Sequence, residues 1–197
     1  MISENIPIDH RVIAEIVEPG ARVLDLGCGT GELLFLLAKE KRARVEGIEL
    51  DDAKIFKCVE KGLSVTHGDI ESGLAEYPDK AFDYVILNQS MQEVKRADLV
   101  ISEALRVGKK VIVGFSNFAH YESRLQIFFL GRTPVTPALP YKWHDTPNLH
   151  FLTISDFWEY SREKKLNVLA AYYLGLRRKV RLFPNLLARA AIFVITK

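Results

Sequence analysis

The stretch from Arg22 to Gly31, Arg-Val-Leu-Asp-Leu-Gly-Cys-Gly-Thr-Gly, constrains the fold of this chain more than any other. Its apolar first half predicts a buried parallel strand over residues 22–26. Glycines at positions 27, 29 and 31 then predict a tight loop that a ligand can approach closely. A helical pattern follows over residues 31–41. Strand, glycine loop and helix in this order predict a crevice at the carboxyl end of the strand, where open α/β sheets bind ligands.

The spacing of the glycines distinguishes between classes of cofactor. A dinucleotide fingerprint would place its third glycine at position 32, but position 32 is Glu and the third glycine comes one residue earlier. Asp25 precedes the loop, and its carboxylate would repel a pyrophosphate but attract an ammonium or sulfonium group. S-adenosylmethionine (SAM) carries both cations and no phosphate. We therefore predict SAM contacts at Asp25, Gly27, Cys28, Gly29 and Gly31; the alternative is a turn whose glycines serve packing only.

Two further acidic residues follow predicted strands. Glu49, with Leu50 beside it, ends a strand over residues 45–50, where a carboxylate can accept the hydroxyl groups of a ribose. Asp69 follows a short strand over residues 63–66 and could accept the amino group of adenine, with Ile70 packing on the ring. The alternatives are a solvated charge at Glu49 and an Asx turn at Asp69.

The opposite side of the crevice is predicted to begin at Asn88 and Gln89, after a strand over residues 82–87. A methyl group carried by the cofactor would face its acceptor there, and positioning is the main requirement of such a transfer. No catalytic base is singled out among the possible bases, which are His67, His120, His144 and His150. The candidate catalytic residues are Asn88, Tyr141 and His150. No His or Cys spacing predicts a metal site.

The rest of the chain alternates strands and helices, which predicts βαβ units around a parallel sheet. Asp9 and Asp51 are expected to cap helices, and the Thr153-x-x-Asp156 pattern predicts a capping box. The remaining predicted elements are a helix over 96–107, a strand over 110–115, a helix from 153 to about 165, and strands over 166–174 and 190–196. The last two strands are expected to be adjacent and antiparallel.

Residues 117–150 break this alternation and are predicted to form an insertion that covers the carboxyl ends of the fourth and fifth strands. Its apolar residues Leu125, Ile127, Phe128 and Phe129 are expected to pack on the domain, with a partner surface as the alternative. Within this cover, Trp143 should be partly exposed, and Tyr141 or His150 should point toward the pocket. Further along the chain, Phe157 and Trp158 should lie in the core. The basic segment 177–181 should form a solvated loop, with nucleic-acid contact as the alternative.

Composition narrows the setting. A chain of 197 residues is most simply one domain over residues 1–197, and a net charge of +2 gives no reason to expect a nucleic-acid partner. No apolar run reaches the length of a membrane span, and the amino-terminal residues lack the apolar core of a secretory signal. Two cysteines without a paired spacing suggest no disulfide framework, so we expect a cytoplasmic location.

The glycine loop with Asp25, Glu49 and Gly68-Asp69 resembles the class I SAM-dependent methyltransferases. A narrower resemblance, over about residues 7–170, is to the methionine biosynthesis protein MetW family. It is carried by Gly47-Ile48-Glu49, Phe82–Leu87, Gln89, Asn117-Phe118, Arg124-Leu125-Gln126, Arg132-x-Pro134-Val135-Thr136, Ala138–Tyr141, Trp143 and Asp145–His150. Thr30 and His144 stand where the family pattern has Asp and Tyr, and the basic tail 175–197 lies outside the clear match.

The resemblance implies an α/β, Rossmann-like, doubly wound sheet of seven strands, mostly parallel with the last strand antiparallel, and an insertion after the fifth. It also implies a role in methionine biosynthesis with homoserine O-acyltransferase as the expected partner. Two hypotheses follow. The first is methyl transfer from SAM to a small-molecule acceptor, with S-adenosylhomocysteine as the product. The second is a non-catalytic, SAM-binding accessory or regulatory subunit that acts with the acyltransferase.

Overall fold

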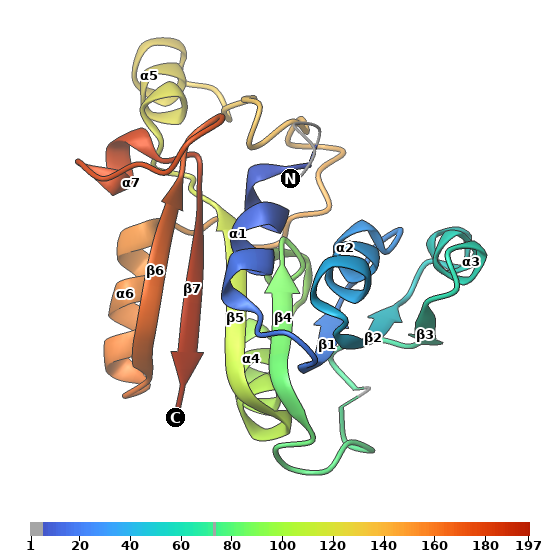
Figure 1. The fold of residues 1–197 in the computed structure, drawn as a ribbon. Coiled ribbons are helices and arrows are strands. Elements are labelled where there is room, and N and C mark those ends of the chain that lie inside the picture. Colours follow the sequence, from blue (N-terminus) through green and yellow to red (C-terminus); the bar gives the residue numbers. More distant parts are fainter. Residues whose placement is uncertain (1–5, 73) are drawn as a thin grey trace.

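The computed structural model describes residues 6–72 and 74–197 of the chain. Residues 1–5 and Gly73 lie outside the described residues. The expectation of no secretory signal rests partly on residues 1–5. A seven-stranded sheet has the strand order β3-β2-β1-β4-β5-β7-β6. The last strand, β7, runs antiparallel to both of its neighbours, and the pairings among the first five strands are all parallel (Figure 1). The predicted fold class is confirmed.

The strands span 4 to 9 residues, and the helices span 3 to 11 residues. The strands are β1 (Arg22–Leu26), β2 (Arg44–Glu49), β3 (Ser64–His67), β4 (Phe82–Asn88), β5 (Gly108–Ser116), β6 (Asn167–Leu174) and β7 (Ala190–Thr196). The helices are α1 (Ile8–Ile16), α2 (Glu32–Lys41), α3 (Asp52–Glu60), η1 (Met91–Glu93), α4 (Ala97–Val107), α5 (Tyr121–Leu130), α6 (Ile154–Glu163) and α7 (Pro184–Leu187). In the described parts of the chain, no helix combines the length and the apolar character needed to cross a bilayer.

Helices cover both faces of the sheet. On one face α1 and α2 bury Ile13 and Leu37 against the strands, and on the other α4 and α6 bury Ile101 and Phe157 (Figure 1). The chain order reverses at β1, which pairs with β2 on one side and β4 on the other. This reversal leaves the carboxyl ends of β1 and β4 open, and such a switch point is where a doubly wound sheet binds its ligand.

Local sequence signals set most helix boundaries as predicted, with one exception. The Asp51 side chain accepts the backbone N–H groups of Ala53 and Lys54, and the capping box of Thr153 and Asp156 forms. Asp9, however, is not a cap, because α1 begins one residue before it, after Pro7. The Asp9 carboxylate instead accepts a hydrogen bond from the side chain of Asn88 at 2.9 Å. A tertiary contact therefore replaces the predicted local one.

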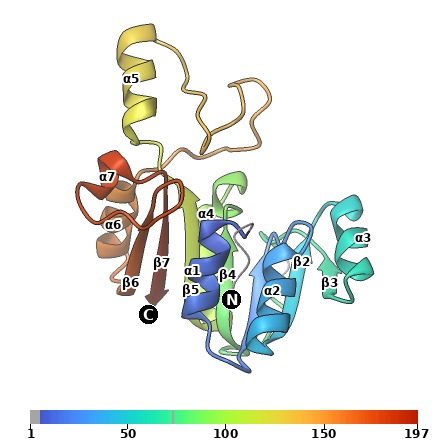
Figure 2. The same cartoon turned by 45° about the horizontal axis from the view of Figure 1, so that its top comes forward.

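The insertion projects beyond the carboxyl edge of the sheet, with α5 standing apart from the body of the molecule (Figure 2). The prediction that Leu125, Ile127, Phe128 and Phe129 pack on the domain is wrong, because these side chains are exposed. The physical reason is that α5 stands beyond the edge of the sheet, and none of its residues reaches the core clusters that the other helices form with the two faces. Trp143 is 75% exposed.

An aromatic cluster packs β7 against β5 and α6. Phe193 is fully buried, and its ring lies 5.8 Å from that of Phe115 and 4.6 Å from that of Phe157, centroid to centroid. Phe157 is buried as predicted. Trp158 is 36% exposed, contacts Phe193 edge-on and donates a hydrogen bond to the hydroxyl of Tyr173, so it lies at the rim of the core rather than within it.

This cluster predicts a large cost for truncating Phe193. Phe193→Ala should lower the free energy of unfolding by about 3–5 kcal/mol, because it removes a fully buried ring and leaves a cavity. The matched control is Phe56→Ala on α3, where the ring is 70% exposed; its effect should stay within about 0.5 kcal/mol. Urea denaturation measures both, and equal effects would contradict the described core.

Candidate functional site

The glycine loop turns tightly against β2. The N–H groups of Gly27 and Cys28 both donate to the carbonyl of Ile48, at 2.8 and 3.1 Å. Gly27, Gly29 and Gly31 have φ angles of +77°, +57° and +79°, a region that side chains with a Cβ rarely adopt. A Cβ on Gly27 would lie 2.7 Å from the Cβ of Ser90. Positive φ therefore favours glycine at all three positions, and at Gly27 the closeness of Ser90, just after β4, leaves no room for a side chain.

Glu49 ties the loop to the end of β2. Its Oε2 accepts the N–H of Gly29 at 2.8 Å, and its Oε1 accepts the N–H groups of Leu50 and Asp51 at 3.0 and 3.1 Å. The side chain is buried but borders the cavity beside the loop. A carboxylate offers about four acceptor sites, so Oε2 retains capacity to accept a hydroxyl group from a ligand.

Asp25 is a buried carboxylate with unused bonding capacity. It is 4% exposed, and no group among the described residues donates a hydrogen bond to its side chain. Burial, reinforced by the negative charge of Glu49, raises the pKa of Asp25 to about 7. Its side chain borders a cavity. A cation bound there would supply the missing partner and stabilise the charged form.

Two cavities meet at the switch point. The larger, of about 510 Å³, is bordered by Glu49, Leu50, Asp69 and Ile70. The smaller, of about 360 Å³, is bordered by Asp25 and Cys28. They share Gly27, Gly29, Lys54, Asn88 and Gln89. The structure thus brings together every predicted cofactor contact except Gly31, which packs instead against Cys58 and Leu63.

Asp69 takes part in the turn that was the alternative to a ligand role. Its Oδ1 accepts the N–H of Glu71 at 2.9 Å, which is the hydrogen bond of an Asx turn. Asp69 also borders the larger cavity with Ile70 beside it. The turn therefore orients the side chain at the edge of the cavity, and the two interpretations are compatible.

The segment after β4 is held in an unusual conformation. Gln89 has a φ of +63°, and its N–H donates to the carbonyl of Gly114 at 2.8 Å. Its side-chain carbonyl accepts hydrogen bonds from Ser116 and Gln92, so it is fixed at the end of β5. The Oδ1 of Asn88 is buried and has no partner among the described residues. Left-handed residues outside glycine and unpaired polar atoms both cluster at functional sites.

Sequence reasoning missed the contribution of α1. Asp9 and His10 border the smaller cavity opposite Asp25. Glu93 borders the larger one, and burial raises the pKa of its carboxyl group. No local signal distinguishes Asp9 and His10, because α1 is brought to the crevice by tertiary packing and by the contact between Asp9 and Asn88.

The insertion contributes less to the crevice than predicted. Leu149 borders the larger cavity, and the N–H groups of Leu149 and His150 both donate to the carbonyl of Gln92. Tyr141 borders a small cavity inside the insertion, and the side chain of His150 is exposed. Among the described residues that line the two crevice cavities, neither Tyr141 nor His150 occurs. Of the three catalytic candidates, the structure places Asn88 alone at the switch point.

Comparison with solved structures defines the class of fold. The chain is similar to a TehB-like SAM-dependent methyltransferase from Corynebacterium glutamicum, with a TM-score of 0.66 and 18% identity over 98% of this chain and 89% of that one. It is also similar to the cyclase SpnF, with a TM-score of 0.69 and 19% identity over 99% of this chain and 85% of that one. The fold is that of the SAM-dependent methyltransferases.

Sequence comparison identifies the family. The family model "Methionine biosynthesis protein MetW" matches residues 7–195. The chain is 37% identical over 158 residues to the bifunctional methionine biosynthesis protein MetXA/MetW of Rhodopirellula baltica. The matched region covers 76% of this chain and 25% of that protein. The chain therefore belongs to the MetW family of methionine biosynthesis, and it spans a quarter of the length of this relative. The family match includes the basic tail up to residue 195, so the prediction that residues 175–197 lie outside it is wrong.

The first two glycines of the loop, Gly27 and Gly29, allow a matched test of the loop geometry. Gly27→Ala should destabilise the protein more than Gly29→Ala, although both residues have positive φ. A left-handed alanine costs about 1–2 kcal/mol at either position, but only at Gly27 does the added carbon meet another side chain, and overpacking adds about 1–3 kcal/mol. Denaturant unfolding of both variants tests this, and equal losses would contradict the closeness of Ser90.

Proposed function

We propose that the crevice between β1 and β4 binds SAM. Asp25 is proposed to hold the ammonium group of its methionine part, Glu49 the ribose hydroxyls, and Asp69 the adenine amino group, with Ile70 against the ring. The observation that carries this proposal is the buried Asp25 carboxylate, which borders a cavity and lacks a hydrogen-bond donor among the described residues. A cationic ligand fits that site, and a phosphate does not.

We further propose that the chain transfers a methyl group from SAM to a small-molecule acceptor, leaving S-adenosylhomocysteine. Bound SAM would supply an electrophilic methyl group on a sulfonium. The chain's own residues would do the rest: Gln89 and Asn88 shape the wall that both cavities share, and the imidazole of His10 lies at the rim where it could accept a proton from the acceptor. Polar side chains in this wall could contact an acceptor, which favours methyl transfer over a purely accessory role.

A second candidate is an accessory subunit that binds SAM and acts with homoserine O-acyltransferase without transferring a methyl group. One observation favours it: the Rhodopirellula relative is named as a MetXA/MetW fusion, so in that protein the MetW-like part shares a chain with MetXA. SAM would affect such a partner only by binding two conformational states of the complex with different affinities.

One experiment separates the two candidates. The purified chain is incubated with SAM and a small-molecule extract of cells, with and without the acyltransferase, and the release of S-adenosylhomocysteine is measured. Methyl transfer predicts release by the chain alone. If S-adenosylhomocysteine binds but none is released, while SAM alters acyltransferase activity, the accessory role is supported and methyl transfer is contradicted.

The raised pKa of Asp25 predicts pH-dependent binding. At a pH below its pKa of about 7, the carboxyl group of Asp25 is mostly protonated and must lose its proton to pair with an ammonium group. The affinity for S-adenosylhomocysteine should therefore fall about tenfold from pH 8 to pH 6, measured by equilibrium dialysis. Asp25→Asn should bind more weakly and lose this dependence, and a native chain with equal affinity at both pH values would contradict the assignment.

The same substitution should stabilise the free protein. Because the pKa of Asp25 is higher in the folded state than its usual value of 3.8, the folded state binds this proton more tightly than the unfolded chain. The contribution of Asp25 to stability therefore falls as pH rises from about 4 to about 7. Asp25→Asn avoids that loss, so at pH 8 it should unfold at higher urea than the native protein while binding ligand more weakly.

His10 gives a test of the transfer step that is separate from binding. His10→Asn should lower the rate of S-adenosylhomocysteine release about 100-fold, the low end of what a positioned base contributes. Binding of S-adenosylhomocysteine should stay within about twofold of the native value, because the asparagine keeps a polar side chain outside the cofactor contacts. A variant with native turnover would remove His10 from the proposed chemistry.

A further inference from the structure

Helix α5 presents an apolar surface that nothing in the described chain covers. Of its ten residues only Ser123 is buried. The side chains of Leu125, Ile127, Phe128, Phe129 and Leu130 are 44–81% exposed, and we refer to them as the α5 face. A surface helix normally buries one apolar stripe; these residues instead lie around the helix, and a concentration of exposed apolar side chains of this kind marks an interaction site.

The α5 face belongs to an ordered unit rather than to a loose segment. At the start of the helix, Arg189 pairs with Glu122 at 2.6 Å, and the side chain of Asn117 donates to the carbonyl groups of Asn185 and Ala188. Further along, the side-chain amide of Gln126 donates to the carbonyl of Val135 and accepts its N–H, at 2.9 and 3.0 Å. These contacts hold α5 at one end to the α7 region and along its length to residues 131–150, which we refer to as the arm.

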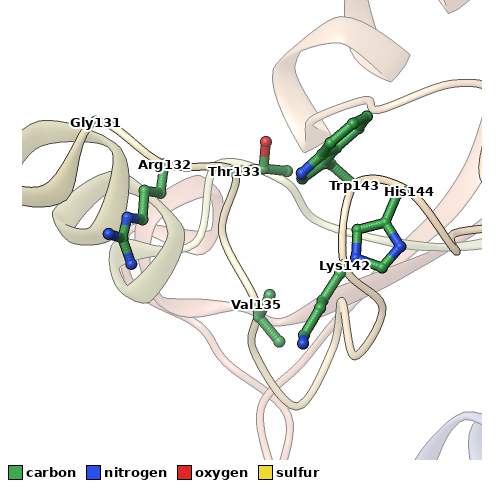
Figure 3. Close-up of a pocket in the computed structure, with 7 residues that line it drawn as sticks. All are labelled: Gly131, Arg132, Thr133, Val135, Lys142, Trp143 and His144. Carbon is green, nitrogen blue, oxygen red and sulfur yellow. The ribbon is translucent and has the colours of Figure 1, made fainter.

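Basic and aromatic side chains border this face. Where α5 ends, a cavity of about 530 Å³ is lined by Arg132, Lys142, Trp143 and His144. Figure 3 shows Lys142 and His144 projecting toward the space between the arm's two segments, with the ring of Trp143 beside Thr133. Where α5 begins, Arg124 shares another cavity with Phe183 and Leu186. Exposed aromatic and arginine side chains together are the composition of energetically important protein contacts.

Charge is concentrated in the same region. Residues 117–150 and 175–189 contain eight lysines and arginines but two acidic residues, a surplus of six positive charges, although the whole chain has a surplus of two. The exposed residues Arg177, Arg178 and Arg181 lie in the loop after β6, which ends at the edge of the sheet where the insertion stands (Figure 1). This distribution predicts a partner surface that is acidic around an apolar centre.

We propose that the α5 face, with Arg132, Lys142 and Trp143 beside it, docks an acidic, apolar-centred surface of the homoserine O-acyltransferase. The inference rests on the partnership named in the proposed function and adds the surface through which it operates. The MetW-like part is a quarter of the Rhodopirellula relative, so a large partner is held beside it in one chain. A second copy of this chain fits less well, because pairing the face with itself would bring two basic rims together.

Two variants test the surface. The first is Phe128→Ser with Phe129→Ser, and the second is Arg132→Glu with Lys142→Glu; all four positions are exposed, so the fold should be kept. The matched controls are Phe56→Ser and Lys57→Glu on α3, also exposed and outside the cavities described. The probe is the purified acyltransferase of the same organism, with affinity measured by calorimetry in low and high salt.

Each surface variant should weaken acyltransferase binding about tenfold or more, as truncation at an interface anchor does. The controls should bind like the native chain, native binding should weaken with salt, and all variants should bind S-adenosylhomocysteine normally. Native affinity in both surface variants would overturn the proposed surface and leave the partnership intact. A native chain that does not bind the acyltransferase would overturn the partnership and the surface together, while the SAM proposal would be judged by ligand binding alone.

Other occupants give distinct results that would also overturn the proposal. If the face joins two copies of this chain, sedimentation will show a native dimer that Phe128→Ser with Phe129→Ser converts to a monomer. If it binds an anionic membrane, the native chain will co-sediment with phosphatidylserine vesicles and the variants will not, while acyltransferase binding stays unchanged.

Discussion

The hydrogen bond from the Gly29 N–H to the Glu49 carboxylate holds the site together. It joins the loop after β1 to the end of β2 at 2.8 Å, and the same carboxylate is fixed by two further backbone amides. Once Glu49 is held, its charge acts on Asp25 and adds to the effect of burial on that group. The buried carboxylate that we propose to bind a cation therefore depends on a loop that the backbone geometry of three glycines makes possible.

The frame and one half of the crevice could be predicted from local sequence. Buried strands, glycines with positive φ and capping residues act over a few positions, so most elements, and the predicted residues from Asp25 to Ile70 other than Gly31, lie where they were expected. Asn88 and Gln89 on the opposite side were also predicted, but the contribution of α1 could not be. His10 reaches the crevice through packing of α1 and a contact 79 residues apart in the chain, between Asp9 and Asn88. No periodicity reports such a contact.

The exposure of α5 was equally beyond local reasoning. Its apolar residues have the composition of a core helix, and whether a core exists for it depends on how completely the other helices cover the sheet. In the structure α5 stands beyond the edge of the sheet and packs on neither large core cluster, so the same residues form a surface. The crevice and this surface lie at the same edge of the sheet but share few residues, and Leu149, which borders the crevice, is the insertion's point of contact with it. Binding of a small ligand and binding of a protein can therefore be altered separately.

The central claim is that the crevice accepts a cationic nucleoside and rejects a phosphate-bearing one. Calorimetric titration of the native chain at pH 8 with SAM, S-adenosylhomocysteine and NAD tests it most directly. The account predicts one site per chain for SAM and for S-adenosylhomocysteine, and no measurable heat with NAD, because Asp25 and Glu49 would repel its pyrophosphate. A folded sample that binds neither SAM nor S-adenosylhomocysteine, or that binds NAD more tightly, would contradict it.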